Sequence, residues 1–247
     1  MQINEIKLIG KSKLTRARLM LAAQLSLGER YTGKGLSPLG QHVMSQVNSR
    51  LDLFDVILAE CYEVIVSEPD NCLAHYIAGI TLNRAAHSGK KDLSIAIINE
   101  AIAHLEQILS LVAGGGEYKT IIFLPREVRS DPQLDREAKT KLGLADLYNE
   151  LGLSYMDVEK WHQALSCYKE VTTLDPQKAT GWLWLSKSLF NTEGADQAIK
   201  TLEYALSTDS SDMNFETLLG TYLRRYRKIA SSRDEIFKVI EGQGRED

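Results

Sequence analysis

The residues that first suggest chemistry lie around three consecutive glycines. Gly114–Gly116 precede Lys119 and Thr120, and a phosphate-binding loop also combines glycines with a Lys-Thr pair. Such a loop needs glycine directly before the lysine and lies between a strand and a helix. Here Tyr118 precedes Lys119, and the segment before the glycines has a helical pattern. We therefore expect no nucleotide site, and a loop that is flexible or contacts a partner.

Metal and nucleophile chemistry have as little support. Cys72 and His75, with Cys61 nearby, lack the second Cys-x2-Cys or His pair that would complete four ligands. Ser37 lacks the strand-to-helix elbow that activates a serine. The five histidines fall in separate segments and form no His-Glu-x-x-His pattern: His42, His75, His87, His104 and His162. We expect no catalytic residue, no metal and no cofactor, and therefore a protein that is not an enzyme.

One basic cluster could in principle contact phosphates, because arginines alternate with tyrosines in it. It consists of Arg224, Arg225, Arg227 and Lys228, with Tyr222 and Tyr226 between them. Cations also favour the last turn of a helix, where they face the negative end of the dipole. The net charge of −4 gives no general attraction to nucleic acid. We expect this cluster to be solvated or to bind peptide, and no nucleic acid partner.

The composition bounds the elements that must position these residues. The chain has 247 residues, of which 44% are hydrophobic and 25% charged, so it can bury a substantial core. Many helix formers, few alternating β-branched runs and only five prolines predict an all-α fold in one elongated domain. Cys61, Cys72 and Cys167 lie in apolar helical patterns as small hydrophobes, which favours a reduced, cytoplasmic setting.

Membrane and export signals are weak in this sequence. No apolar run reaches about 18 residues, so we expect no membrane-spanning helix. A basic stretch from Lys7 to Arg18 precedes apolar residues and loosely imitates a signal peptide, but Gln24 interrupts the apolar run. An amphipathic first helix from about Ser12 to Tyr31 is the simpler interpretation.

The stretch from Ala145 to Pro176 carries the pattern on which the fold prediction rests. Residues three, four and seven apart share one face of a first helix: Tyr148, Leu151, Gly152 and Tyr155. Gly152 leaves a notch on that face, so a second helix can approach closely. That second helix has its own apolar stripe: Trp161, Ala164, Leu165, Tyr168, Val171 and Leu174. Pro176 ends it, because proline disfavours the helical conformation of the residue before it.

The spacing of Tyr148, Leu151, Gly152, Tyr155, Ala164, Tyr168 and Pro176 resembles the tetratricopeptide repeat, a unit of 34 residues. One repeat length downstream, matching slots hold Trp182, Leu185, Ala198, Leu202 and Ala205, while Ser186 replaces the notch glycine and Ser210 the final proline. Leu219, Gly220 and Leu223 repeat the first-helix pattern once more and then the pattern ends, as in a terminal cap. Ser232 and Glu235 have the spacing of a capping box, which predicts a last short helix.

The N-terminal part matches the pattern less closely. We divide the single domain 1–247 into divergent repeats over 1–112, a loop over 113–130, and regular repeats with a cap over 131–247. Ile57, Cys61 and Val64 form the stripe of a helix that Pro69 ends, and His75 occupies the slot of Tyr148 and Trp182. Asp131-Pro132 is predicted to start a long helix through Tyr155.

The resemblance implies a right-handed superhelical stack of antiparallel helical hairpins whose first helices line a concave groove. It also implies a non-enzymatic adaptor, scaffold or co-chaperone-like module that binds a peptide or helix of another protein. Helical steps place these residues in the groove: Tyr76, Asn83, Asn149, Leu153, Leu183, Lys187, Phe190 and Arg224. The alternative is a membrane-associated assembly or secretion factor that uses the basic N-terminus and the apolar segment Ile121–Leu124.

Overall fold

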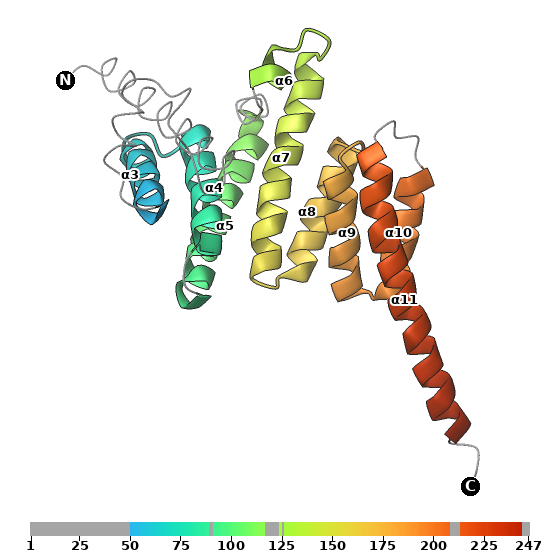
Figure 1. Cartoon of the computed structure of the whole chain (residues 1–247). Coiled ribbons are helices and arrows are strands. Elements are labelled where there is room, and N and C mark those ends of the chain that lie inside the picture. The colour runs from blue at the N-terminus through green and yellow to red at the C-terminus, as the bar shows by residue number, and fades with distance from the viewer. Residues whose placement is uncertain (1–49, 89–90, 117–123, 125, 208–212, 244–247) are drawn as a thin grey trace, which may run out of the picture. The chain divides into compact units, whose positions relative to one another are not determined.

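The computed structural model describes residues 50–88, 91–116, 124, 126–207 and 213–243. The predicted helix from Ser12 to Tyr31 therefore lies outside the described residues. Within these ranges every regular element is a helix, and helices pack against their neighbours, which confirms the all-α prediction (Figure 1). The chain forms two compact units, Met1–Gly143 and Leu144–Asp247, which are described separately below.

Unit 1 is built on helices α3 (Arg50–Ser67), α4 (Cys72–Ser88) and α5 (Lys91–Leu111), with α3 and α5 both packed against α4. Ile57, Cys61 and Val64 are at most 1% exposed, as their helical spacing predicts. The helix α3 ends two residues before Pro69, which is the predicted stop.

A glycine makes the close contact between α4 and α5. A methyl group added to Gly79 would lie 2.9 Å from the side chain of Leu105, too close for real carbon atoms. The absence of a side chain at Gly79 thus admits Leu105, which is fully buried together with Ala101 and Ile108.

The segment predicted as a loop over 113–130 is helical over 113–116 and 126–130, and Leu124 lies in a bend. A π-helical turn, η1 (Val112–Gly116), follows α5, and a short helix, α6 (Arg126–Ser130), precedes a turn at Asp131. The side chain of Asp131 accepts a hydrogen bond of 2.8 Å from the amide of Gln133 within that turn. The residues 117–123 of the segment lie outside the described residues.

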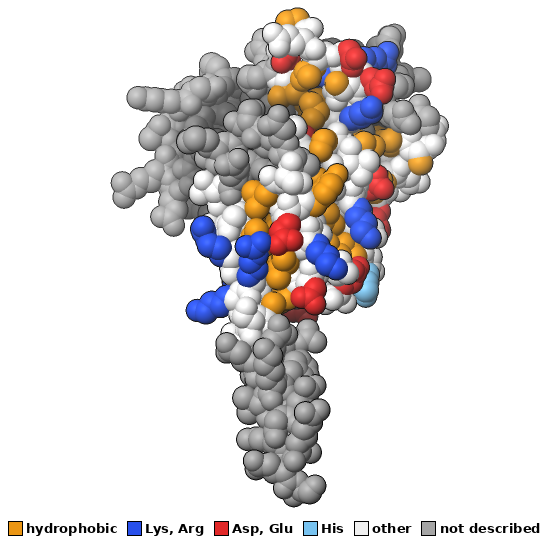
Figure 2. All heavy atoms as spheres, turned by 90° about the vertical axis from the view of Figure 1, so that its right-hand side faces the viewer, with side chains coloured by type: hydrophobic (Ala, Val, Ile, Leu, Met, Phe, Trp, Pro, Cys, Tyr) orange, Lys and Arg blue, Asp and Glu red, His pale blue; other side chains and the backbone are white. Residues whose placement is uncertain are grey.

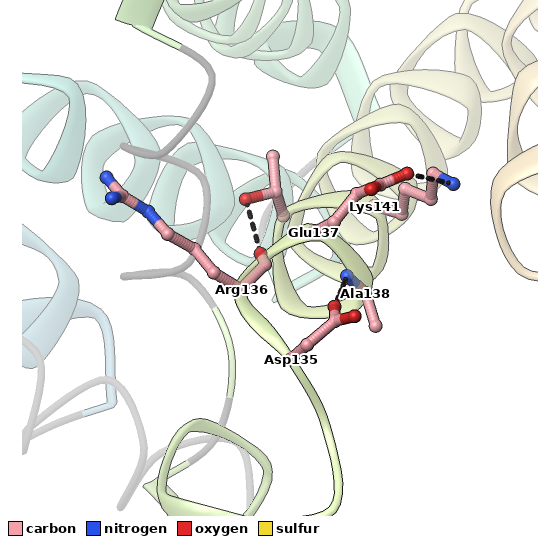
Figure 3. A network of polar contacts seen from close by, with 6 residues as sticks. Asp135, Arg136, Glu137, Ala138 and Lys141 are labelled. Atoms are coloured by element: carbon pink, nitrogen blue, oxygen red, sulfur yellow. Dashed lines mark hydrogen bonds and ion pairs between the residues drawn. The ribbon is translucent and has the colours of Figure 1, made fainter.

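Helix α7 (Arg136–Asp157) begins later than predicted. The carboxylate of Asp135 accepts a hydrogen bond of 2.7 Å from the amide of Ala138, which is the geometry of an N-cap (Figure 3). One turn on, Lys141 and Glu137 form an ion pair of 2.8 Å on the exposed face. The predicted cap at Asp131 is wrong, because its side chain is used in the preceding turn.

In unit 2, α7 packs against α8 (Trp161–Leu174) through the second notch. A methyl group at Gly152 would lie 2.8 Å from the ring of Tyr168, which is fully buried. Ala164, Leu165 and Val171 are buried on the same stripe, and α8 ends before Pro176. The sequence prediction of this hairpin is confirmed.

Helices α9 (Ala179–Thr192) and α10 (Ala195–Ser207) form the next hairpin. The backbone of α9 approaches α8 closely, since a methyl group at Gly181 would lie 2.8 Å from Val171. Ser186, in the slot of the notch glycine, is fully buried and donates a hydrogen bond of 2.7 Å to the carbonyl of Leu183. The serine hydroxyl therefore bonds within its own helix, and it also forms a side-chain hydrogen bond with Tyr226.

The last element is one long helix, α11 (Met213–Gln243), which packs against α9 and α10 and then runs past them (Figure 1). The predicted break at Ser232 is absent. Its hydroxyl donates a hydrogen bond of 3.0 Å to the carbonyl of Lys228, four residues earlier, as a serine inside a helix does. The capping-box prediction is wrong for this reason.

Candidate functional site

The eight residues predicted to line a groove are divided between the two units. Tyr76 and Asn83 lie on α4 in unit 1, and the other six lie on α7, α9 and α11 in unit 2. Each group is therefore considered within its own unit.

The two residues of unit 1 offer little surface. Tyr76 is half-buried and packs on the core cluster between α3 and α4. Asn83 is only 2% exposed, so its amide points into the protein and not at a partner. Of the two, Tyr76 alone retains exposed area that a ligand could touch.

On α7, the two candidates are Asn149 and Leu153, both half-buried. The side-chain oxygen of Asn149 is buried and has no hydrogen-bond partner in the part of the chain that the structure describes. A buried amide oxygen without a partner costs free energy, but this atom has almost no accessible surface and therefore offers no contact to a ligand. Only the exposed part of the half-buried Asn149 side chain remains for a partner.

On α9, the candidates differ in exposure. Helical steps alone placed Leu183 in the groove. In the structure it is 4% exposed and belongs to the core, so it cannot contact a partner segment. The ammonium of Lys187 lies over the ring of Trp184 at 5.1 Å from its centroid, and the lysine is half-buried. Phe190 stacks on Tyr226 of α11, with ring centroids 4.9 Å apart and planes 12° apart.

On α11, Arg224 is exposed and its guanidinium donates a hydrogen bond of 3.3 Å to the hydroxyl of Thr221. The basic cluster that includes Arg224 lies in the middle of α11 and not in its last turn, contrary to the helix-dipole interpretation. Arg227 of this cluster pairs with Glu203 of α10 at 2.7 Å. Figure 2 shows basic and acidic side chains interspersed on one face of the molecule, with hydrophobic side chains between them.

One ion pair at this site was missed by sequence reasoning. Lys178, which precedes α9, donates to the carboxylate of Asp146 on α7 at 2.5 Å, and both side chains are largely buried. The negative charge of Asp146 is therefore matched by Lys178 and does not oppose a bound anion. Burial raises the pKa of the neighbouring Asp175, which Lys178 partly counteracts. No local spacing indicates a pair separated by 32 residues.

The cysteines are structural in this fold. Cys61, Cys72 and Cys167 are all reduced and buried, as predicted for small hydrophobes. Burial raises the pKa of the Cys61 thiol to about 12, which disfavours the reactive thiolate. Among the described residues, no group of three or more histidine, cysteine, aspartate or glutamate side chains could hold a metal ion.

One described helix, Ile95–Gly114, is long and apolar enough to cross a membrane by length and composition, which the sequence expectation had ruled out. Helices in the cores of proteins pass the same test. Ala101, Leu105 and Ile108 of this helix are fully buried, in the part that packs on α4.

Comparison with known proteins adds no family. No protein-family model matches the chain, and no curated protein sequence matches it.

Proposed function

We propose that this chain is a non-enzymatic protein-interaction module of the tetratricopeptide kind, a right-handed stack of helical hairpins that holds a peptide or helix of another protein. In this proposal the groove is formed by the first helices of successive hairpins, which are α7, α9 and α11 in unit 2. The protein acts as an adaptor or scaffold in the cytoplasm.

The observation that carries the proposal is the repetition of helix starts at the tetratricopeptide length. Helix α8 begins at Trp161 and α10 begins 34 residues later at Ala195, while α9 begins at Ala179 and α11 begins 34 residues later at Met213. Hairpins of different lengths would not keep this interval, because each inserted residue would shift the first residue of the next helix.

A second repetition supports the same proposal from side-chain contacts. The indole nitrogen of Trp182 donates a hydrogen bond of 2.8 Å to the carbonyl of Pro176, six residues earlier. In unit 1 a ring nitrogen of His75 lies 2.8 Å from the carbonyl of Pro69, also six residues earlier. In both units, therefore, a ring nitrogen near the start of one helix lies at hydrogen-bond distance from the carbonyl of the proline in the turn before that helix.

The surface of unit 2 favours a partner segment that is partly apolar and carries some negative charge. Phe190 supplies a half-buried aromatic ring, and Lys187 and Arg224 supply cations. A tight grip on an acidic chaperone tail needs several cations on one carboxylate. Lys178 is occupied by Asp146, so we expect no such grip.

Affinity purification of the full chain with mass spectrometry should identify the partner, and charge reversal then tests the groove. The double variant Lys187→Glu and Arg224→Glu should weaken binding at least tenfold, about 1.4 kcal/mol. A matched control reverses two exposed lysines on second helices, Lys169→Glu on α8 and Lys200→Glu on α10. Equal losses from both pairs, or none from the first, would place the binding site elsewhere.

A further inference from the structure

Two histidines from neighbouring helices of unit 1 are joined through their rings. The Nδ1 atoms of His75 on α4 and His104 on α5 lie 2.9 Å apart, and the ring centroids are 5.1 Å apart. His75 is 7% exposed and His104 is half-buried. The pair therefore links the two helices of the hairpin inside the protein.

The contacts determine which nitrogen of each ring carries a proton. The second nitrogen of His75, Nε2, lies 2.8 Å from the carbonyl of Pro69, and a carbonyl only accepts hydrogen bonds. Neutral His75 must then be protonated on Nε2, which leaves its Nδ1 as an acceptor. His104 must donate from Nδ1 to complete the bond.

These protonation states limit the charge that the pair can hold. A proton added to Nε2 of His104 leaves the bond between the two rings intact. A further proton on Nδ1 of His75 would point one N–H at another across 2.9 Å, so the bond would be lost and two positive charges would be adjacent.

The neighbouring titratable groups come from α3, from α5 and from the turn between α3 and α4. Tyr62 of α3 has its ring 5.8 Å from that of His104 and donates a hydrogen bond of 2.6 Å to Glu100 of α5. At the turn between α3 and α4, the carboxylate of Glu68 accepts from Asn71. Burial and His75 lower the pKa of His104, and Glu100 offsets this in part.

We propose that His75 and His104 form a pH-sensitive clasp between α4 and α5, which holds while no more than one of the two is protonated and opens when both are. In unit 2, the position equivalent to His75 is Trp182, which donates a hydrogen bond to the carbonyl of Pro176. Its indole does not titrate. Of these two contacts to a proline carbonyl, only the one made by His75 in unit 1 involves a titratable side chain.

The direction of the pH effect follows from linkage. A histidine with a lowered pKa binds protons less well in the folded state than in the unfolded state. The contribution of His104 to stability is therefore fully present above the ordinary histidine pKa of about 6.5, and it is lost as the pH falls from that value toward the lowered pKa.

Nitrogen-detected NMR of the histidine rings in the full chain tests the assignment directly. At pH 8, His75 should be protonated on Nε2 and His104 on Nδ1. A spectrum with the proton of His75 on Nδ1 overturns the proposal, whatever any variant does.

Thermal melts between pH 8 and 5 test the clasp with the variant His104→Gln, whose amide can donate to His75 or accept from it without titrating. Between pH 8 and 5, the melting temperature of the parent should fall by at least about 3 °C more than that of this variant. The control His162→Gln removes an exposed histidine of α8 and should keep the parent profile. Parallel pH profiles for the parent and His104→Gln would overturn the proposal.

Discussion

A glycine within a helix can admit a neighbouring side chain or simply weaken the helix, and this chain contains both kinds at equivalent repeat positions. Gly152 faces the ring of Tyr168, whereas an added methyl group at Gly220 of α11 would meet nothing within 4 Å. The two positions lie in corresponding slots of the first-helix pattern, and only the first is followed by a second helix that fills it.

This contrast predicts opposite effects of the same substitution. Gly152→Leu should destabilise the protein by about 1–3 kcal/mol, because Tyr168 is fully buried and cannot move aside. Gly220→Leu should be neutral or stabilising by up to about 1 kcal/mol, since leucine favours the helix more than glycine does. Urea titrations of both variants would measure the difference, and equal costs would contradict the notch assignment.

The hydroxyl of Tyr168 is a second single-residue feature with a measurable cost. Its oxygen is buried without a hydrogen-bond partner among the described residues, and burial raises the pKa of Tyr168. Tyr168→Phe should therefore leave the stability of the protein unchanged or raise it. The gain is at most the desolvation cost of the buried hydroxyl, about 1–3 kcal/mol. Tyr62→Phe, which removes the hydroxyl that donates to Glu100, is the control and should not stabilise it.

At the scale of elements, the start of α7 was determined by which aspartate could cap it. Both Asp131 and Asp135 accept backbone hydrogen bonds, but only Asp135 does so from the first turn of the helix. Asp135→Ala should cost about 1 kcal/mol, and Asp131→Ala should cost less because the turn is outside the helix. Circular dichroism melts of the two variants check this order. A larger loss of stability from Asp131→Ala would instead support the helix start predicted at Asp131.

The continuity of α11 makes a similar prediction. A serine in a capping box contributes about 1 kcal/mol, whereas the hydroxyl of Ser232 only returns to the carbonyl of Lys228 within the helix. Ser232→Ala should therefore change stability by less than about 0.5 kcal/mol, or raise it slightly. A loss of a full kilocalorie in thermal melts would indicate a helix break at this residue.

At the scale of the molecule, the second unit has a core of its own. Its compact boundary begins at Leu144, and its fully buried residues include Leu147, Tyr168, Leu202 and Leu219. A fragment of residues 131–247, which keeps the whole of α7 with its cap, should unfold cooperatively in urea. A gradual loss of helix without a transition would show that the unit depends on the rest of the chain.

Much of the fold could be predicted from the sequence, because helices are determined by residues three and four positions apart. The stripes of α3 and α8, the notch at Gly152 and the stop before Pro176 all follow from such neighbours. The groove was predicted less well, since helical steps give the face of a helix but not what covers it. Leu183 has the right spacing for the groove and is nevertheless buried in the core.

By itself the sequence determined the helices, their apolar faces and the 34-residue interval between helix starts from α8 to α11, since each is encoded in local spacing. Only the tertiary structure decided that Lys178 would neutralise Asp146, that Phe190 would stack on Tyr226, and that His75 would bond His104. These contacts join different helices. They depend on how far each helix rotates and slides against its neighbour, which the packing of the whole core determines.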